Sequence, residues 1–86
     1  MRVVFHKNFE KKYKRLRSSE KDRFKKILNT FIIDPFYPTL NNHVLSGKYG
    51  GFRSINIGGD LRAIYKMLDN DMYLFVTIDS HSNLYE

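Results

Sequence analysis

The residue types best suited to chemistry lie in the second half of the chain. His81 and Tyr85 are four residues apart, just after an apolar run. They are preceded by Arg53, Asp60 and Arg62. An imidazole and a carboxylate can transfer protons, a guanidinium can bind two phosphate oxygens, and a phenol can stack on a base. These are the groups that RNA cleavage needs, provided that the fold brings them together.

Each acid–base candidate also has a purely structural interpretation. His81 is our first choice for proton transfer, because an imidazole can act as acid or base near neutral pH. Alternatively, it is an exposed histidine without a chemical role. Asp60 could orient a histidine or act as the base, or it could cap the turn that begins at Gly58. His43 could be catalytic, or it could simply be hydrogen-bonded to the backbone of its loop.

Cations that could bind phosphate form a second group of candidates. Arg62 and Arg53 each carry a guanidinium, although Arg53 could instead form an ion pair at the rim of a sheet. Lys48 lies in a loop, where it could contact an RNA backbone. Three tyrosines could stack on bases, Tyr37, Tyr49 and Tyr85, although Tyr37 could instead pack beside Pro38.

The composition excludes several kinds of protein and site. The 86 residues fit one domain, 1–86. No cysteine is present, so the sequence offers no disulfide, thiolate nucleophile or thiolate ligand. His6, His43 and His81 lack the short spacing of metal ligands, and we expect neither a metal nor another cofactor. The early charges and short apolar runs indicate no signal peptide and no membrane span, which predicts a cytoplasmic protein.

The positive charge is concentrated in one part of the chain. The net charge is +6, but residues 7–26 hold ten basic and three acidic residues, a net charge of +7. A segment of this kind suits nucleic acid or an acidic protein partner, although it could also be a solvated helical face. The candidates for contact with RNA in this segment are Lys11, Lys12, Arg15 and Lys25.

Hydrophobic periodicity predicts the elements that must position these residues. Apolar residues recur with helical spacing in two segments and with the spacing of strands in four others. The expected helices span 7–17 and 19–33, and the expected strands span 2–5, 52–57, 61–68 and 72–78. A short link between the helices predicts a helical hairpin. Residues 34–51 are expected to form a long irregular loop.

This order of elements, β-α-α-β-β-β, predicts an α+β fold in which the helical hairpin packs on a twisted antiparallel sheet. Along 72–78, Met72, Leu74, Val76 and Ile78 alternate with more polar positions. The pattern predicts that these four side chains face the helices. The other face of the sheet would then be free to carry a site.

Three stretches resemble the RelE/ParE superfamily of toxin–antitoxin toxins, and within it the YafQ-like and RelE-like mRNA interferases. The stretches are residues 45–53, 60–66 and 80–85, and the resemblance covers essentially the whole chain. It implies an enzyme that enters the ribosomal A site and cuts mRNA without a metal. It also implies a cognate antitoxin that wraps and silences the toxin. The toxin–antitoxin complex can then bind its operator DNA through the antitoxin.

The resemblance also implies roles for particular residues. His43, Asp60 and His81 match the catalytic set of YafQ-like members, and Tyr85 stands where an aromatic residue closes the last motif. Arg62 is similar to the phosphate-binding arginine of RelE-like members.

Two positions depart from the YafQ-like pattern. Asn56 replaces another histidine, and Leu61 stands where a tryptophan can follow the aspartate. Asn56 stays a candidate for contact with RNA. The departures leave two other functions open, a ParE-like toxin that binds DNA gyrase without cutting RNA and an inactive relative that binds only antitoxin.

Overall fold

The computed structural model describes residues 1–69 and 71–85. Within these residues the strands are β1 (Arg2–Phe5), β2 (His43–Val44), β3 (Arg53–Gly58), β4 (Leu61–Met67) and β5 (Met72–Ser80). The α-helices are α1 (Lys7–Lys14), α2 (Ser18–Ile33) and α3 (His81–Leu84), and two short 3₁₀ turns are η1 (Pro38–Leu40) and η2 (Gly47–Tyr49). The expected element order is confirmed, with β2 and α3 as additions.

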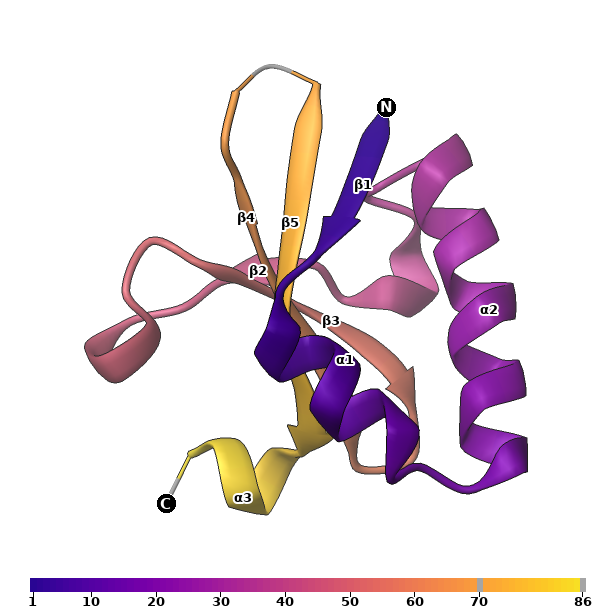
Figure 1. Cartoon of the computed structure of the whole chain (residues 1–86). Coiled ribbons are helices and arrows are strands. Elements are labelled where there is room, and N and C mark those ends of the chain that lie inside the picture. The colour runs from indigo at the N-terminus through magenta and orange to yellow at the C-terminus, as the bar shows by residue number, and fades with distance from the viewer. Residues whose placement is uncertain (70, 86) are drawn as a thin grey trace.

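The five described strands form one sheet in the order β1-β5-β4-β3-β2. The α+β class is confirmed, but the sheet is mixed rather than wholly antiparallel, because β1 runs parallel to β5. The other neighbouring strands are antiparallel. The two long helices carry the chain away from β1 before it returns to the opposite edge of the sheet at β2, and α3 lies at the C-terminal end (Figure 1).

Local hydrogen bonds set where the helices begin. His6 Nδ1 accepts from the amide of Asn8 at 3.0 Å and caps α1, which stops at Lys14, three residues earlier than expected. Glu20 accepts from the amide of Arg17 at 3.0 Å at the start of α2. Helix α2 ends at Ile33.

A cluster of aromatic rings joins the helices to the sheet. Phe24 of α2 lies 5.2 Å from Phe9 of α1 and 6.0 Å from Phe75 of β5, measured between ring centroids. Phe31 lies 5.0 Å from Tyr65 and 5.5 Å from Phe75. These five rings are buried. Tilted and edge-to-face pairs of this kind add to the stabilisation that comes from the large apolar area each ring removes from water.

The prediction for the face of β5 is wrong in the first half of the strand. Tyr65 pairs with Phe75, but the preceding Ile64 pairs with Thr77, so Val76 is an extra residue in a β-bulge. Before the bulge, Tyr73 and Phe75 pack in the core, and after it Ile78 does. The reason is that a bulge reverses the alternation of side chains, which composition along the strand does not reveal.

A glycine at the β3–β4 turn brings this turn close to α2. Gly58 has φ +142°, and a Cβ atom there would lie 2.9 Å from Cδ of Arg23. A side chain at this position would therefore be both strained and in collision with the arginine.

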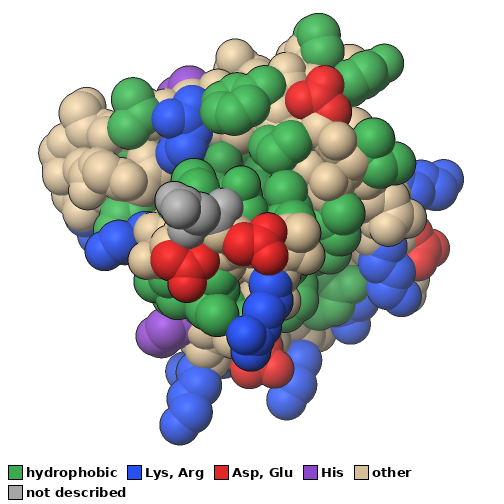
Figure 2. Space-filling view, turned by 90° about the horizontal axis from the view of Figure 1, so that it is seen from above, with side chains coloured by type: hydrophobic (Ala, Val, Ile, Leu, Met, Phe, Trp, Pro, Cys, Tyr) green, Lys and Arg blue, Asp and Glu red, His purple; other side chains and the backbone are tan. Residues whose placement is uncertain are grey.

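Hydrophobic side chains are widespread on the end of the molecule seen from above (Figure 2). Among the exposed apolar residues, Ile33 at the end of α2 is 85% exposed and Phe36 after it is 64% exposed. Within the described residues, no helix has the length and apolar character needed to span a membrane.

The aromatic cluster predicts that alanine substitutions at two positions on α2 have very different effects on the free energy of unfolding. Phe31→Ala should lower the free energy of unfolding by about 3–5 kcal/mol, because it removes a fully buried ring. Ile33→Ala, a truncation at the exposed end of the same helix, should change it by less than about 0.5 kcal/mol. Urea unfolding followed by circular dichroism measures both. Equal losses would contradict the assignment of the core.

Candidate active site

A cleft of about 460 Å³ opens on the sheet face that turns away from the aromatic cluster. Four of the five residues expected to be catalytic line it: His43, Arg62, His81 and Tyr85. They come from β2, β4, α3 and the residue after α3. The remaining lining residues are Asn41, Val44, Leu45, Ser46 and Ser54. The cleft therefore gathers two imidazoles, one guanidinium and one phenol from distant parts of the chain.

Asp60 lies beside this cleft, but its carboxylate does not line it. Oδ2 accepts from the hydroxyl of Ser82 at 3.2 Å, and the residue borders a second groove toward α2. The carbonyl of Asp60 accepts from the backbone amide of His81 at 2.7 Å. Asp60 thus joins the β3–β4 turn to the start of α3, and its geometry suits positioning better than direct proton transfer.

His43 is held in one orientation by its own loop. Its Nδ1 lies 2.8 Å from the carbonyl oxygen of Asn41. A carbonyl oxygen can only accept a hydrogen bond, so Nδ1 carries the proton in the neutral ring. Nε2 is then the basic nitrogen. This tautomer is the one that could accept a proton from a substrate hydroxyl.

Arg62 presents a guanidinium that pairs with backbone rather than with a carboxylate. Nη1 donates to the carbonyls of Gly59 at 2.9 Å and Leu61 at 3.1 Å. Among the described residues, no acidic side chain lies within ion-pair distance of Arg62. Its charge is therefore available to a phosphate.

Two polar atoms on the same sheet face have no hydrogen-bond partner among the described residues, Ser54 Oγ and Asn56 Oδ1. Ser54 is fully buried and borders the cleft, and Asn56 pairs with Arg62 across β3 and β4. A buried acceptor without a partner loses the hydrogen bond that water would give it, so both atoms carry a desolvation cost beneath this face of the sheet. Asn56 is thus placed beside the cleft without lining it.

Helix α3, which carries His81, is anchored by Asp79. Oδ1 accepts from the Ser80 amide at 2.8 Å and from Asn83 Nδ2 at 2.9 Å, and Oδ2 accepts from Lys12 Nζ at 2.7 Å. Partial burial alone would raise the pKa of Asp79, but hydrogen bonds from Lys12, Asn83 and Ser80 outweigh it and lower the pKa below its ordinary value of 3.8. The rings of His81 and Tyr85 lie 4.6 Å apart on this anchored helix turn.

Arg53 lies outside the cleft, on the same side of the sheet as the core. Its Nε donates to Asn42 Oδ1 at 2.8 Å, and its guanidinium stacks on the ring of Phe36 at 5.2 Å. Asn42 Nδ2 in turn donates to the hydroxyl of Tyr65 at 2.8 Å. Burial raises the pKa of this hydroxyl, so it stays neutral. The network fixes Asn42 on one side of the sheet and leaves the next residue, His43, at the cleft.

The expected RNA contacts on the basic helices fall into two groups. Lys12 is occupied by Asp79 and therefore belongs to the anchor of α3. Lys11 and Arg15 are exposed and border a shallow hollow on α1 with Lys7 and Lys14. Lys25 is exposed on α2. Lys48 does not line the cleft, and its ammonium group lies 5.4 Å from the ring centre of Tyr49.

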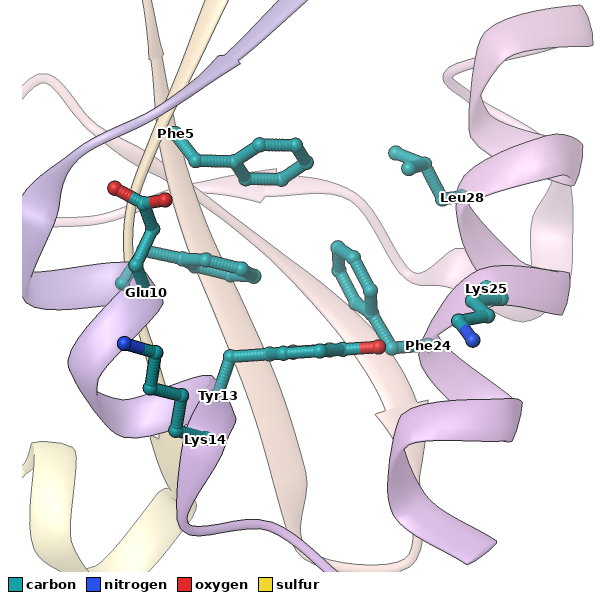
Figure 3. Close-up of a pocket in the computed structure, with 8 residues that line it drawn as sticks. Phe5, Glu10, Tyr13, Lys14, Phe24, Lys25 and Leu28 are labelled. Atoms are coloured by element: carbon teal, nitrogen blue, oxygen red, sulfur yellow. The ribbon is translucent and has the colours of Figure 1, made fainter. Parts of the chain in front are cut away.

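An apolar groove of about 340 Å³ lies between the two basic helices. Figure 3 shows the rings of Phe5, Tyr13 and Phe24 around it, with Leu28 on the α2 side. The charged residues that border the groove are Glu10, Lys14 and Lys25.

Sequence reasoning missed two residues of this region. Asp79 lies just after the expected last strand and received no role from the sequence, although a carboxylate at the end of an apolar run is a signal of a partly buried ion pair. Ser54 carried no signal, because a small polar residue in a strand is common. Its importance comes from complete burial at the edge of the cleft.

The fold and cleft can be compared with known proteins. A family model described as "Bacterial toxin of type II toxin-antitoxin system, YafQ" matches residues 1–86. Among solved structures, YafQ from E. coli strain BL21(DE3) has a TM-score of 0.82 at 19% identity, covering 100% of both chains. Curated protein sequences give no match.

Two further solved structures are toxin–antitoxin complexes. The E. coli DinJ–YafQ complex has a TM-score of 0.75 at 20% identity, covering 98% of this chain and 96% of that one. The archaeal RelE–RelB complex from Pyrococcus horikoshii OT3 has a TM-score of 0.73 at 20% identity, covering 92% of each chain.

The helical hairpin on a five-stranded sheet is thus the fold of the RelE-like toxins. Because the family model spans the whole sequence, the chain belongs to the YafQ family of type II toxin–antitoxin toxins. The resemblance stated from the three sequence stretches is confirmed.

The anchor of α3 predicts a pH-dependent contribution to stability. The lowered pKa of Asp79 means that its ion pair stabilises the fold above the ordinary pKa near 4 and that this contribution is lost as the pH falls through the lower, folded-state pKa. Asp79→Asn should therefore unfold at a lower temperature than wild type at pH 7, with a difference that closes below about pH 4.

Lys12→Met removes the same ion pair from the other side and should behave in the same way. Thermal unfolding of the three proteins from pH 7 to pH 2.5 measures the effect. A difference that is constant over this range would contradict the assignment.

Proposed function

We propose that this chain is a ribosome-dependent endoribonuclease that cuts mRNA in the A site. The observation that carries the proposal is the convergence of His43, Arg62, His81 and Tyr85 on one cleft. A toxin that only blocked a partner would have no need of a general base, a general acid and a free guanidinium at one place. Membership of the YafQ family supports the same conclusion.

The geometry supports a reaction in which the RNA supplies its own nucleophile. His43 Nε2 takes the proton of the 2′-hydroxyl, and the 2′-oxygen attacks the adjacent phosphorus. His81 protonates the departing 5′-oxygen as the P–O5′ bond breaks. The products are a 2′,3′-cyclic phosphate and a 5′-hydroxyl end. The side chains thereby supply both proton transfers, and the reaction is proposed to need no metal.

Arg62 supplies the charge that the transition state requires. The phosphorane-like state carries more negative charge on its oxygens than the ground state, so a guanidinium beside it lowers the barrier. Two backbone carbonyls hold Nη1 in place before substrate arrives. Tyr85, next to the His81 ring, would stack on a base at the cleft.

The remaining candidates act through the residues that line the cleft. Asp60 positions His81 through the bond between its carbonyl and the His81 amide. Arg53 positions His43 through Asn42. Asn56 lies beside Arg62 and would contact the ribose or phosphate once RNA is bound.

Two partners follow from this function, in the cytoplasm where ribosomes are found. Ribosomal RNA would bind the exposed basic residues of α1 and α2 through phosphate contacts. A cognate antitoxin would cover part of the same surface, and the apolar groove of Figure 3 with its lysine rim suits an amphipathic, acidic segment. The complex of the two would bind operator DNA through the antitoxin.

The two imidazoles should be separately essential for cleavage. His43→Ala and His81→Ala should each slow cutting of ribosome-bound mRNA about 10²–10⁴-fold, because each removes one proton-transfer group. Asp60→Asn, which keeps the carbonyl that holds His81, should slow it far less. Single-turnover cleavage of mRNA on programmed ribosomes measures the rates, and mapping of RNA 5′ ends after induction identifies the cuts.

Full activity of both histidine variants would remove the catalytic assignment. Growth arrest with uncut mRNA and accumulated cleaved gyrase–DNA complexes would favour the ParE-like alternative. Wild-type protein that binds antitoxin but neither cuts mRNA nor arrests growth would be an inactive relative.

Charge reversal should separate ribosome binding from chemistry. A triple change of Lys11, Arg15 and Lys25 to Glu should weaken binding to ribosomes and flatten the dependence of log K on log salt, because fewer counterions are released. Arg2→Glu makes the same kind of change outside the two helices and should have little effect. Sedimentation with ribosomes at several salt concentrations measures the slope, and an unchanged slope in the triple variant would refute the prediction.

A further inference from the structure

We propose that the chain has a second RNA subsite, which stacks a nucleobase in an aromatic pocket beside the cleft. This pocket has a volume of about 330 Å³ and is lined by His6, Asn8, Tyr49, Phe52, Val76 and Thr77. The inference rests on the proposed function, because it names a further contact for the same RNA strand. None of the residues assigned to the chemistry lines this pocket.

The pocket and the cleft lie on the two sides of the η2 turn. Ser46, just before the turn, lines the cleft, and Tyr49, at its end, lines the aromatic pocket. Ser54 and Thr77 belong to one cross-strand row, since both pair with Ile64. Two strand spacings separate them, a distance of about 10 Å. A single RNA strand that crosses the η2 turn can therefore reach both places.

The chemistry of the pocket suits a nucleobase. The rings of Tyr49 and Phe52 lie 6.3 Å apart at 74°, and both side chains are half-buried and therefore preorganised. Lys48 Nζ lies 5.4 Å from the ring centre of Tyr49, and Lys66 Nζ lies 5.4 Å from that of Phe52. Aromatic faces combined with cations bind single-stranded nucleic acid through stacking and phosphate contacts, with little dependence on sequence.

The charge around the pocket supports an RNA ligand. The lining residues include no carboxylate. Because Lys48 and Lys66 lie over its two rings, a polyanionic strand leaving the cleft would be drawn toward this pocket.

His6 adds a hydrogen-bond donor to the pocket. Its Nδ1 is used as an acceptor for the amide of Asn8 at the start of α1. The neutral ring consequently carries its proton on Nε2. His6 can therefore cap α1 through Nδ1 and also donate a hydrogen bond from Nε2 to a base or a ribose.

The experiment combines variants of Tyr49 with mRNA that lacks one base. Tyr49→Leu should raise the concentration of ribosome-bound mRNA at half-maximal rate about tenfold, the size expected of one base–aromatic stack, with the maximal rate nearly unchanged. Tyr49→Phe keeps the ring and should behave as wild type. Tyr37→Leu, a matched change at a tyrosine that is 48% exposed and outside both pockets, should have no effect.

An abasic nucleotide placed at successive positions around the cut identifies the stacked base. At one position the abasic nucleotide should raise the mRNA concentration at half-maximal rate about tenfold for the wild type. It should leave this concentration unchanged for Tyr49→Leu, because that variant has already lost the contact. The subsite is refuted if Tyr49→Leu has the same half-maximal mRNA concentration as wild type on intact mRNA. It is also refuted if the ratio between variant and wild type stays the same at every abasic position.

A second measurement is independent of cleavage and of variant folding. Wild-type protein is titrated with a 2′-O-methyl heptanucleotide, which cannot be cut, and followed by NMR. Shifts at Tyr49, Phe52 and His6 as well as at Arg62 and His81 would support the subsite. Shifts confined to the cleft residues would overturn it while leaving the nuclease proposal in place. No shifts, together with uncut mRNA on ribosomes, would overturn both.

Discussion

One extra residue in β5 determines which side chains of this strand enter the core and which face the opposite side of the sheet. The bulge at Val76 lets Phe75 pack against the helices and still places Ile78 in the same core two pairings later. It also turns Thr77 and Asp79 to the opposite face. Without the bulge, a regular strand could bury Phe75 or Ile78 but not both. The carboxylate of Asp79, which anchors α3, would then point in another direction.

The cleft depends on this arrangement through Asp79. The carboxylate joins α1, β5 and α3 by three hydrogen bonds, so the helix turn that bears His81 is held by the same element that carries the aromatic core. The opposite wall is held in a comparable way, since Asn42 is fixed by Tyr65 and Arg53 beneath His43. Preorganisation of both imidazoles therefore depends on polar networks outside the cleft, together with the bond between His43 Nδ1 and the carbonyl of Asn41.

Much of this molecule is predictable from local patterns. Apolar spacing locates α2 and the three long strands to within a few residues, because burial of one helical or strand face demands that spacing. Residue types, together with the resemblance of the three sequence stretches, identify His43, Arg62, His81 and Tyr85 as candidates, because only a few side chains transfer protons, bind phosphate or stack on bases at neutral pH. The concentration of charge in residues 7–26 is likewise a property of the sequence itself.

The tertiary structure alone decided how these parts meet. It turned the carboxylate of Asp60 out of the cleft and paired Lys12 with Asp79, 67 residues away. It also placed β1 parallel to β5 and inserted the bulge at Val76. These outcomes depend on cross-strand register and on contacts between distant segments, which are set by the packing of the whole core. A pattern within one segment determines which faces must be buried, whereas the partner that buries each face is determined only when the chain closes on itself.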